Sequence, residues 1–139
     1  MIFVDANVYM YAAGMSHVHK RPSAALLAAI ARGEIAAGTS VEVLQEILHR
    51  HRAIGRWAEG SRLYDRVRVL MDTIVEVTIE DLDSARELLD THSRLSARDA
   101  VHVSTALNLR CTAICSYDSG FDSVTTIVRQ VPEDLLPRS

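Results

Sequence analysis

Apolar and polar positions along the 139-residue chain predict helices that alternate with short buried strands. The run from Ile2 to Val4 is wholly apolar, as expected of a strand buried on both faces of a parallel sheet. Later runs of small or β-branched residues predict further strands, at about residues 34–38, 73–77, 112–116 and 124–128. Between them, apolar residues recur at helical spacing, at about residues 7–13, 22–31, 40–52, 61–71, 78–89 and 96–109. This alternation predicts an α/β domain with a mostly parallel sheet of about five short strands.

Polar residues at the expected helix starts support these boundaries. Asn7 is expected to cap the first helix and Gly14 to end it. A Ser or Thr followed three residues later by an acid is the signature of a capping box, in which each side chain accepts a hydrogen bond from the other residue's backbone N–H. Such pairs are Thr39 with Glu42, Thr78 with Asp81, and Ser96 with Asp99.

The composition is that of an ordinary globular domain, with 48% hydrophobic and 24% charged residues. At this length we expect residues 1–139 to form a single domain. No apolar run approaches the roughly 20 residues that span a bilayer, so no association with a membrane is expected. The sequence starts without the basic region and cleavage site of a signal peptide, and we therefore expect a cytoplasmic protein.

The basic residues have an unusual distribution. The net charge of −3 argues against binding nucleic acid through bulk charge alone, but Lys20 is the only lysine and six arginines fall between Arg50 and Arg68. Guanidinium groups suit phosphate oxygens, although a genome-wide bias towards arginine codons would give the same count. Arg50, Arg52 and Arg56 could line an RNA path, and a solvated helix face is the equal alternative.

Several acids are placed to reach the carboxyl ends of the strands, where ligand sites gather in parallel sheets. Asp5 follows the first strand, and Asp118 lies just beyond the fourth. Glu46 stands at the border of an apolar helix stripe and Asp99 in the first turn of a helix, so both can reach the same edge. Each also has a simpler interpretation: turn formation for the two strand-end acids, pairing with Arg50 for Glu46, and capping for Asp99.

Taken together, the acids indicate a metal site. Clustered carboxylates repel one another, and burying them is costly unless a cation compensates. Oxygen-only ligands favour Mg²⁺ or Mn²⁺ over Zn²⁺. Such ions lower the pKa of a bound water and stabilise charge on a phosphoryl group, which is nuclease chemistry without a nucleophilic side chain.

The segments that carry these acids give the chain a resemblance to the PIN-domain ribonucleases, and among them to the VapC toxins of bacterial toxin–antitoxin pairs. The segments occur in the family's order and spacing, and together they span nearly the whole chain. They are residues 4–8 (Val-Asp-Ala-Asn-Val), 39–46, 95–103 and 114–122.

The resemblance implies a three-layer α/β/α domain and an Mg²⁺- or Mn²⁺-dependent endoribonuclease that cleaves RNA. The catalytic acids that it implies are Asp5, Glu46, Asp99 and Asp118. Metal binding would fall to Asp5, Asp99 and Asp118 among these. The auxiliary residues would be Asn7, Ser116 and Asp122.

The resemblance also implies partners. The protein would form a homodimer and would be neutralised by a cognate VapB-like antitoxin, through which it would be held at operator DNA. Tyr117 stands where the family often has a smaller residue, and the arginine-rich stretch is a second departure. Neither departure affects the acids, but both leave the preferred RNA open.

Two other function classes remain as alternatives. Phosphotransferases of the haloacid-dehalogenase type and receiver domains also use an acid after the first strand, but both would need a lysine beyond a later strand. The only lysine, Lys20, lies in an early loop. A non-catalytic module that binds RNA or an antitoxin is the third hypothesis, and the intact set of acids disfavours it.

The remaining candidates have simpler interpretations. His17 and His19 could bind a metal, although loop histidines are usually solvated. His102, one turn after Asp99, is expected to pack in the fold or to support a site residue rather than to act as a base.

The two cysteines, Cys111 and Cys115, are separated by about 13 Å of predicted strand, which exceeds the roughly 7 Å limit for a disulfide. They are therefore expected to be small buried hydrophobes, with a metal or redox role as the alternative.

Overall fold

A parallel sheet forms the centre of the computed structural model, which describes residues 1–137 and thus leaves the last two residues of the chain outside. Within this range the sheet has five strands in the order β3-β2-β1-β4-β5, and every neighbouring pair is parallel. The strands are β1 (Ile2–Val4), β2 (Ala37–Ser40), β3 (Ile74–Val75), β4 (Ala113–Cys115) and β5 (Val128–Gln130). The predicted α/β class is confirmed, and the sheet is wholly rather than mostly parallel.

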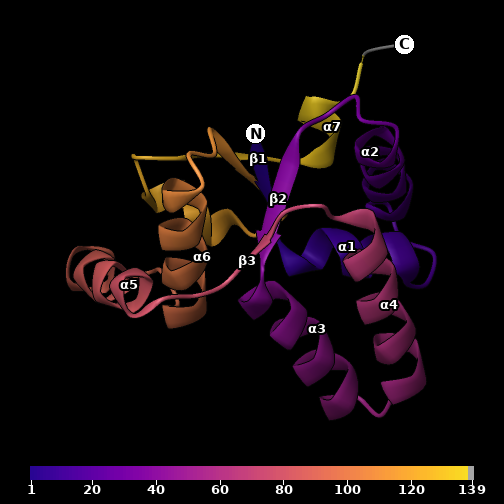
Figure 1. The fold of residues 1–139 in the computed structure, drawn as a ribbon, viewed down its shortest axis with the longest axis horizontal. Helices are drawn as coiled ribbons and strands as arrows, with labels where there is room; N and C mark the ends of the chain where they lie inside the picture. The colour runs from indigo at the N-terminus through magenta and orange to yellow at the C-terminus, as the bar shows by residue number, and fades with distance from the viewer. Residues whose placement is uncertain (138–139) are drawn as a thin grey trace.

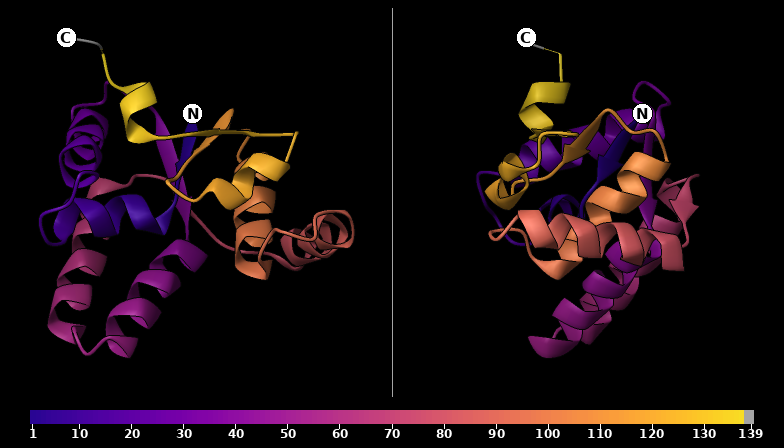
Figure 2. Two further views of the ribbon diagram at one scale, coloured as in Figure 1. Left: turned by 180° about the vertical axis from the view of Figure 1, so that it is seen from behind. Right: turned by 90° about the vertical axis from the view of Figure 1, so that its left-hand side faces the viewer.

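Helices cover both faces of the sheet and give the three layers that the family resemblance implies. They are α1 (Ala6–Ala13), α2 (Lys20–Ala31), α3 (Val41–Ala53), α4 (Trp57–Leu70), α5 (Ile79–Thr91), α6 (Ala97–Asn108) and α7 (Pro132–Leu135), with a 3₁₀ turn η1 (Ser119–Ser123). In Figure 1, α5 and α6 lie on one side of the sheet, and α1, α2 and α4 on the other. The antiparallel pair of α3 and α4 extends beyond the carboxyl ends of the strands (Figure 2).

The core lies on both sides of the central strands. Phe3, Val4 and Ile114 are fully buried, as expected of strands that are covered on both faces. Val43 and Ile47 of α3 join the same apolar cluster. Because the strands are so tightly enclosed, the side chains that follow them at the carboxyl edge are held in place. No helix within residues 1–137 has the length and apolar character to cross a membrane.

Two helix caps differ from the predicted ones. Asp5, not Asn7, caps α1, because the chain turns into the helix directly at the end of β1, and Asp5 Oδ1 accepts a hydrogen bond from Ala6 N at 2.7 Å. Ser40, not Thr39, caps α3. Thr39 belongs to β2, and its hydroxyl donates to Val4 O at 2.9 Å instead. The capping box predicted for α5 is present.

Three elements are displaced from their predicted boundaries. β2 is Ala37–Ser40 rather than residues 34–38, and β5 is Val128–Gln130 rather than residues 124–128. Both shifts follow from pairing with distant strands, which a local pattern does not contain. Helix α4 begins at Trp57 rather than at residue 61. Gly60 lies inside this helix because α3 approaches closely there: an added Cβ would stand 2.4 Å from His51 Cβ.

Candidate active site

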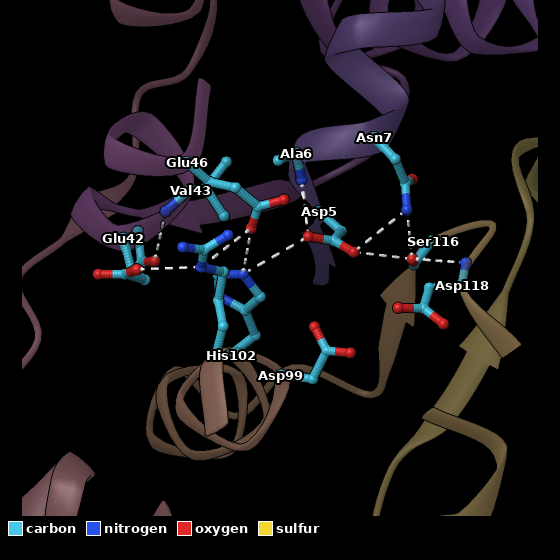
Figure 3. A network of polar contacts seen from close by, with 12 residues as sticks. Asp5, Ala6, Asn7, Glu42, Val43, Glu46, Asp99, His102, Ser116 and Asp118 are labelled. Carbon is cyan, nitrogen blue, oxygen red and sulfur yellow. Dashed lines mark hydrogen bonds and ion pairs between the residues drawn. The ribbon is translucent and has the colours of Figure 1, made fainter. Parts of the chain in front are cut away.

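The predicted acids meet in one pocket at the carboxyl edge of the sheet. Asp5 follows β1 and Asp118 lies three residues beyond β4, while Glu46 comes from α3 and Asp99 from the first turn of α6. All of them line a cavity of about 440 Å³ together with Asn7. Figure 3 shows the carboxylates of Asp5, Asp99 and Asp118 turned towards one region.

Asp5 is the most firmly held of these acids. It is only 4% exposed, and its pKa is raised chiefly because burial removes water from the carboxylate. Oδ1 accepts the Ala6 N–H, and Oδ2 accepts hydrogen bonds from Ser116 Oγ at 2.8 Å and from Asn7 Nδ2 at 3.3 Å. The carboxylate therefore has little freedom to rotate.

Ser116 connects the ends of β1 and β4. Besides donating to Asp5, its hydroxyl oxygen accepts hydrogen bonds from Asn7 Nδ2 at 2.9 Å and from Asp118 N at 3.0 Å. Asn7 Oδ1 in turn accepts a bond from Tyr117 N at 3.3 Å. Asn7 and Ser116 thus lie beside the acids and hold both strand ends in register (Figure 3).

Asp99 has a carboxylate that helix capping does not use. Ser96 caps α6 by accepting the Asp99 N–H at 3.1 Å, but within the described residues no reciprocal bond from the Asp99 side chain completes a capping box. Partial burial, followed by the negative charge of Asp5 and the nearby carboxyl of Asp118, raises the pKa of Asp99 to about 7. Burial and neighbouring negative charge both disfavour the ionised form of Asp99, and a bound cation would offset the repulsion.

Glu46 is paired with a histidine rather than with Arg50. His102 Nε2 lies 3.2 Å from Glu46 Oε1 and 3.6 Å from Asp5 Oδ1. Burial lowers the pKa of His102, but the hydrogen bond to Glu46 and the charge of Asp5 outweigh it, so the net shift is upward. The imidazole is fully buried against Phe3, with 5.7 Å between ring centroids.

His102 was expected from the sequence to pack in the fold or to support a site residue, and it does both, because it is buried against Phe3 and bonds to Glu46. One atom each from Asp5, Glu46 and His102 lie within 4.8 Å of one another, a separation that could hold a metal ion. Carboxylate oxygens suit Mg²⁺ or Mn²⁺, whereas an imidazole is a commoner ligand of zinc, copper, iron or nickel. This placement follows from the spacing already noted in the sequence, since a residue one turn after Asp99 shares its helix face.

Asp122 lies apart from these acids and is not among the residues that line the cavity. Arg129 binds it through two hydrogen bonds, Nε to Oδ1 at 2.7 Å and Nη2 to Oδ2 at 3.1 Å, which lowers the pKa of Asp122. Arg129 Nη1 also donates to the backbone oxygen of Ser116 at 3.2 Å. Among residues 1–137, Asp122 is thus connected to Asp5 through Arg129 and Ser116.

The three arginines expected along an RNA path separate into two groups. Arg50 and Arg56 line the cavity that holds the acids. Arg52 instead places its guanidinium 5.4 Å from the ring centroid of Trp57, in a different hollow. Both cysteines are free and buried, as expected for small hydrophobes.

Comparison with known proteins agrees with this geometry. The PIN-domain family model matches residues 2–126. The chain is 38% identical over 129 residues to ribonuclease VapC13 of Mycobacterium tuberculosis, a match that covers 93% of this chain and 98% of the relative. The chain therefore belongs to the PIN-domain family, and within it to the VapC ribonucleases, the toxins of toxin–antitoxin systems. The resemblance noted in the sequence is thereby confirmed.

Solved structures of VapC proteins share the fold. The crystal structure of Mycobacterium tuberculosis VapC20, a toxin that cleaves the sarcin–ricin loop, matches with a TM-score of 0.75 at 17% identity, over 91% of this chain and 97% of that one. The structure of VapBC2 from Rickettsia felis, bound to a DNA fragment from its promoter, matches with a TM-score of 0.72 at 14% identity, over 94% and 98%. At these identities the likeness concerns the fold alone.

Proposed function

We propose that this chain is a metal-dependent endoribonuclease that hydrolyses phosphodiester bonds in RNA and acts as the toxin of a toxin–antitoxin pair. The observation that carries the proposal is the convergence of Asp5, Glu46, Asp99 and Asp118 in one pocket of a VapC-family chain. Chain segments far apart in sequence contribute these acids, so the cluster is a property of the fold rather than of local composition.

The donor set fits a divalent cation. The pKa values of Asp5 and Asp99 are both raised by burial and by neighbouring negative charge, and a bound cation would remove that repulsion. We assign Asp5, Asp99 and Asp118 as its ligands and Mg²⁺ or Mn²⁺ as the ion. When bound, such an ion supplies an activated water and charge stabilisation at the phosphoryl group.

The protein's own residues orient this chemistry. Ser116 and Asn7 fix Asp5 through hydrogen bonds, and His102 fixes Glu46 next to Asp5. Glu46 is then placed to take a proton from a water molecule that attacks phosphorus. Asp122 has an auxiliary role, exerted through Arg129 on the backbone of Ser116.

Arginines in and beside the acidic pocket can bind the phosphates of the RNA backbone. Arg50 and Arg56 line the acidic pocket, and Arg56 also lines a neighbouring hollow of about 350 Å³ together with Arg62 and Arg66. Guanidinium groups bind phosphate oxygens through paired hydrogen bonds. We assign these four arginines to the RNA path and exclude Arg52, which lies over Trp57.

The proposal includes partners. The related VapBC2 was solved as a complex bound to promoter DNA, which supports a VapB-like antitoxin as the partner of this chain and operator DNA as a ligand of their complex. A homodimer, a single PIN domain over residues 1–139 and a cytoplasmic location complete the proposal.

Incubation of the purified protein with cellular RNA and Mg²⁺ or Mn²⁺ tests the function. Cleavage at discrete positions is expected, with loss on addition of EDTA and in the Asp99→Asn variant. A protein that binds RNA or its antitoxin but never cuts RNA with either ion would replace the enzyme with a non-catalytic binding module. Unchanged cleavage by Asp5→Asn would reject the proposed site.

A further inference from the structure

An aromatic cluster stands beside the acidic pocket. Tyr11 comes from α1, His17 and His19 from the loop before α2, and Tyr117 from the segment after β4. Tyr11 is the hub of this ring cluster, with its ring centroid 4.7 Å from His17, 4.9 Å from His19 and 5.4 Å from Tyr117. His19 and Tyr117 are stacked at 3.6 Å with 14° between their planes.

The members of the ring cluster have different surroundings. His19 and Tyr117 are partly buried and stack on each other, and the Tyr117 hydroxyl donates to Glu133 Oε1. His17 is exposed, and both His17 and Tyr11 line the cavity that also contains the acids. The stacked pair of His19 and Tyr117 therefore forms the more buried part of the cluster. Tyr11 and His17 form the part that faces the pocket.

The loop that carries the histidines is anchored at both ends. Lys20 Nζ donates to the backbone oxygen of Gly14, and Lys20 N donates to His17 O at 3.1 Å. His19 N donates to His17 Nδ1 at 3.1 Å, which fixes the plane of the exposed imidazole. A ring that is both exposed and fixed in orientation loses little conformational entropy when a flat ligand stacks on it.

The chemistry of the pocket identifies such a ligand. Tyr and His rings stack on nucleobases, and the acids beside them act on a phosphodiester while Arg50 and Arg56 suit phosphate oxygens. We propose that Tyr11 and His17 form a subsite for one nucleobase of single-stranded RNA adjacent to the cleaved bond. Single-stranded RNA is required because the bases of a duplex are stacked on each other and cannot reach a protein ring. This subsite rests on the proposed ribonuclease function and adds base recognition to it.

A purely structural role for the rings makes a different prediction. If they only held the loop, Tyr11→Leu and His17→Ala would lower stability and leave RNA recognition to the arginines. A base subsite instead couples each ring to one base of the ligand, and this coupling can be measured with a double-mutant cycle. The cycle pairs removal of the ring with removal of the base.

The experiment uses the full chain carrying Asp99→Asn, so that bound RNA stays intact. The probes are a single-stranded RNA of about ten nucleotides of mixed sequence that spans a position cleaved by the active protein, so that its register is fixed, and the same strand with an abasic residue placed at each position in turn. One abasic position is expected to weaken binding about tenfold. In His17→Ala the intact strand should bind about tenfold more weakly, and the abasic residue at that position should cause no further loss.

Two variants separate stacking from charge and from folding. His17→Phe keeps a ring and should restore tight binding of the intact strand. His49→Ala removes an exposed histidine of α3 that does not line this pocket, and it should leave every affinity unchanged. In the active protein, His17→Ala should raise KM more than it lowers kcat, since stacking positions the substrate.

The outcomes distinguish the subsite from the function on which it rests. If the Asp99→Asn protein binds the strand but the ring variants keep both the affinity and the abasic effect, the subsite is rejected and the ribonuclease proposal stands. If the wild type cleaves no RNA and the Asp99→Asn protein binds no strand, both are rejected.

Discussion

The pocket has two kinds of lining that differ in how firmly they are held. The acids come from strand ends and from helices packed on the sheet, and Asp5 is fixed by hydrogen bonds from Ala6, Asn7 and Ser116. The side chains proposed for RNA recognition lie further from the sheet: Arg50 and Arg56 on or beside α3, and His17 in a loop, all of them exposed. The proposed chemistry thus rests on rigid elements, and the proposed recognition rests on surface side chains.

This difference has consequences for what each region tolerates. Catalytic groups must be held within a fraction of an ångström, and rigid secondary structure with supporting hydrogen bonds provides that. Exposed side chains on helix faces and loops can be exchanged without disturbing the core. Changes in the acidic region should therefore affect the chemical step, whereas changes in the recognition region should affect which RNA is bound.

The largest effect is expected from Asp99→Asn. Loss of this carboxylate removes a proposed ligand, and since a metal ion supplies several kcal/mol of transition-state stabilisation, RNA cleavage should fall by at least about 100-fold. The fold should persist because the amide is nearly the same size and relieves repulsion with Asp5. Cleavage of a labelled transcript and the melting temperature of the metal-free protein measure both effects. Residual cleavage within tenfold of wild type would place the chemistry elsewhere.

His102 is expected to have the next largest effect. His102→Leu keeps an apolar side chain in the buried site but removes the imidazole that lies 3.6 Å from Asp5 Oδ1, a proposed metal ligand, and 3.2 Å from Glu46 Oε1, which then keeps the longer 3.9 Å ion pair with Arg98. Loss of such a supporting contact commonly lowers metal affinity by about 10- to 100-fold. Calorimetric titration with Mn²⁺ measures this directly, and Val103→Ala, a buried change on the same helix, controls for general loosening of α6. Equal affinities in His102→Leu and the wild type would exclude a role in the site.

Metal binding should depend on pH through Asp99. Its pKa is about 7 in the metal-free protein, so below this pH a cation must displace a proton. The affinity for Mn²⁺ should therefore fall by about tenfold for each unit by which the pH is lowered. Asp99→Asn should flatten this dependence. Titrations above and below neutral pH measure it, and a wild-type affinity that does not vary with pH would contradict the assignment.

The stability of the metal-free protein should fall with rising pH, whereas its affinity for Mn²⁺ should rise. Between the ordinary pKa of 3.8 and the raised value of about 7, the folded protein holds a proton on Asp99 that the unfolded chain has released. The free energy of unfolding therefore falls as pH rises through this window, and Asp5, whose pKa is also raised, adds to the fall. Added Mn²⁺ should reverse it. Thermal unfolding with EDTA and with Mn²⁺ gives both curves.

Much of the acidic region could be predicted from the sequence because short sequence patterns place its residues at strand ends and helix starts. Asp5 follows an apolar run, and the acid of Ser96-x-x-Asp99 marks a helix start, so both could be assigned to the carboxyl edge. The displaced β2 and β5 could not be placed correctly, since their registers depend on pairing with β1 and β4. The ring cluster had no local signal either, because it joins Tyr11 to Tyr117 across nearly the whole chain.

The arginines offer a direct comparison within the recognition region. Arg56→Ala should weaken RNA binding about fivefold and reduce the slope of log affinity against log salt by about one, because one phosphate contact is lost. Arg52→Ala is the matched control, since Arg52 lies over Trp57 and outside the pocket. Binding of a short RNA to the Asp99→Asn protein at several salt concentrations separates them. Identical slopes for the two variants would remove Arg56 from the RNA path.

The smallest effect is expected from Asp122→Asn, at a residue outside the lining of the pocket. The side chain of Asp122 is 56% exposed and is bound by Arg129, whose Nη1 donates to the backbone oxygen of Ser116, the residue that bonds Asp5. Loss of the charge should loosen Arg129 slightly and lower cleavage by only about twofold, since exposed ion pairs contribute little. Arg129→Gln removes the same pair together with the bond to Ser116 and should lower cleavage more. A loss in Asp122→Asn as large as that of Asp99→Asn would mean that Asp122 turns into the pocket when RNA binds and acts on the substrate itself.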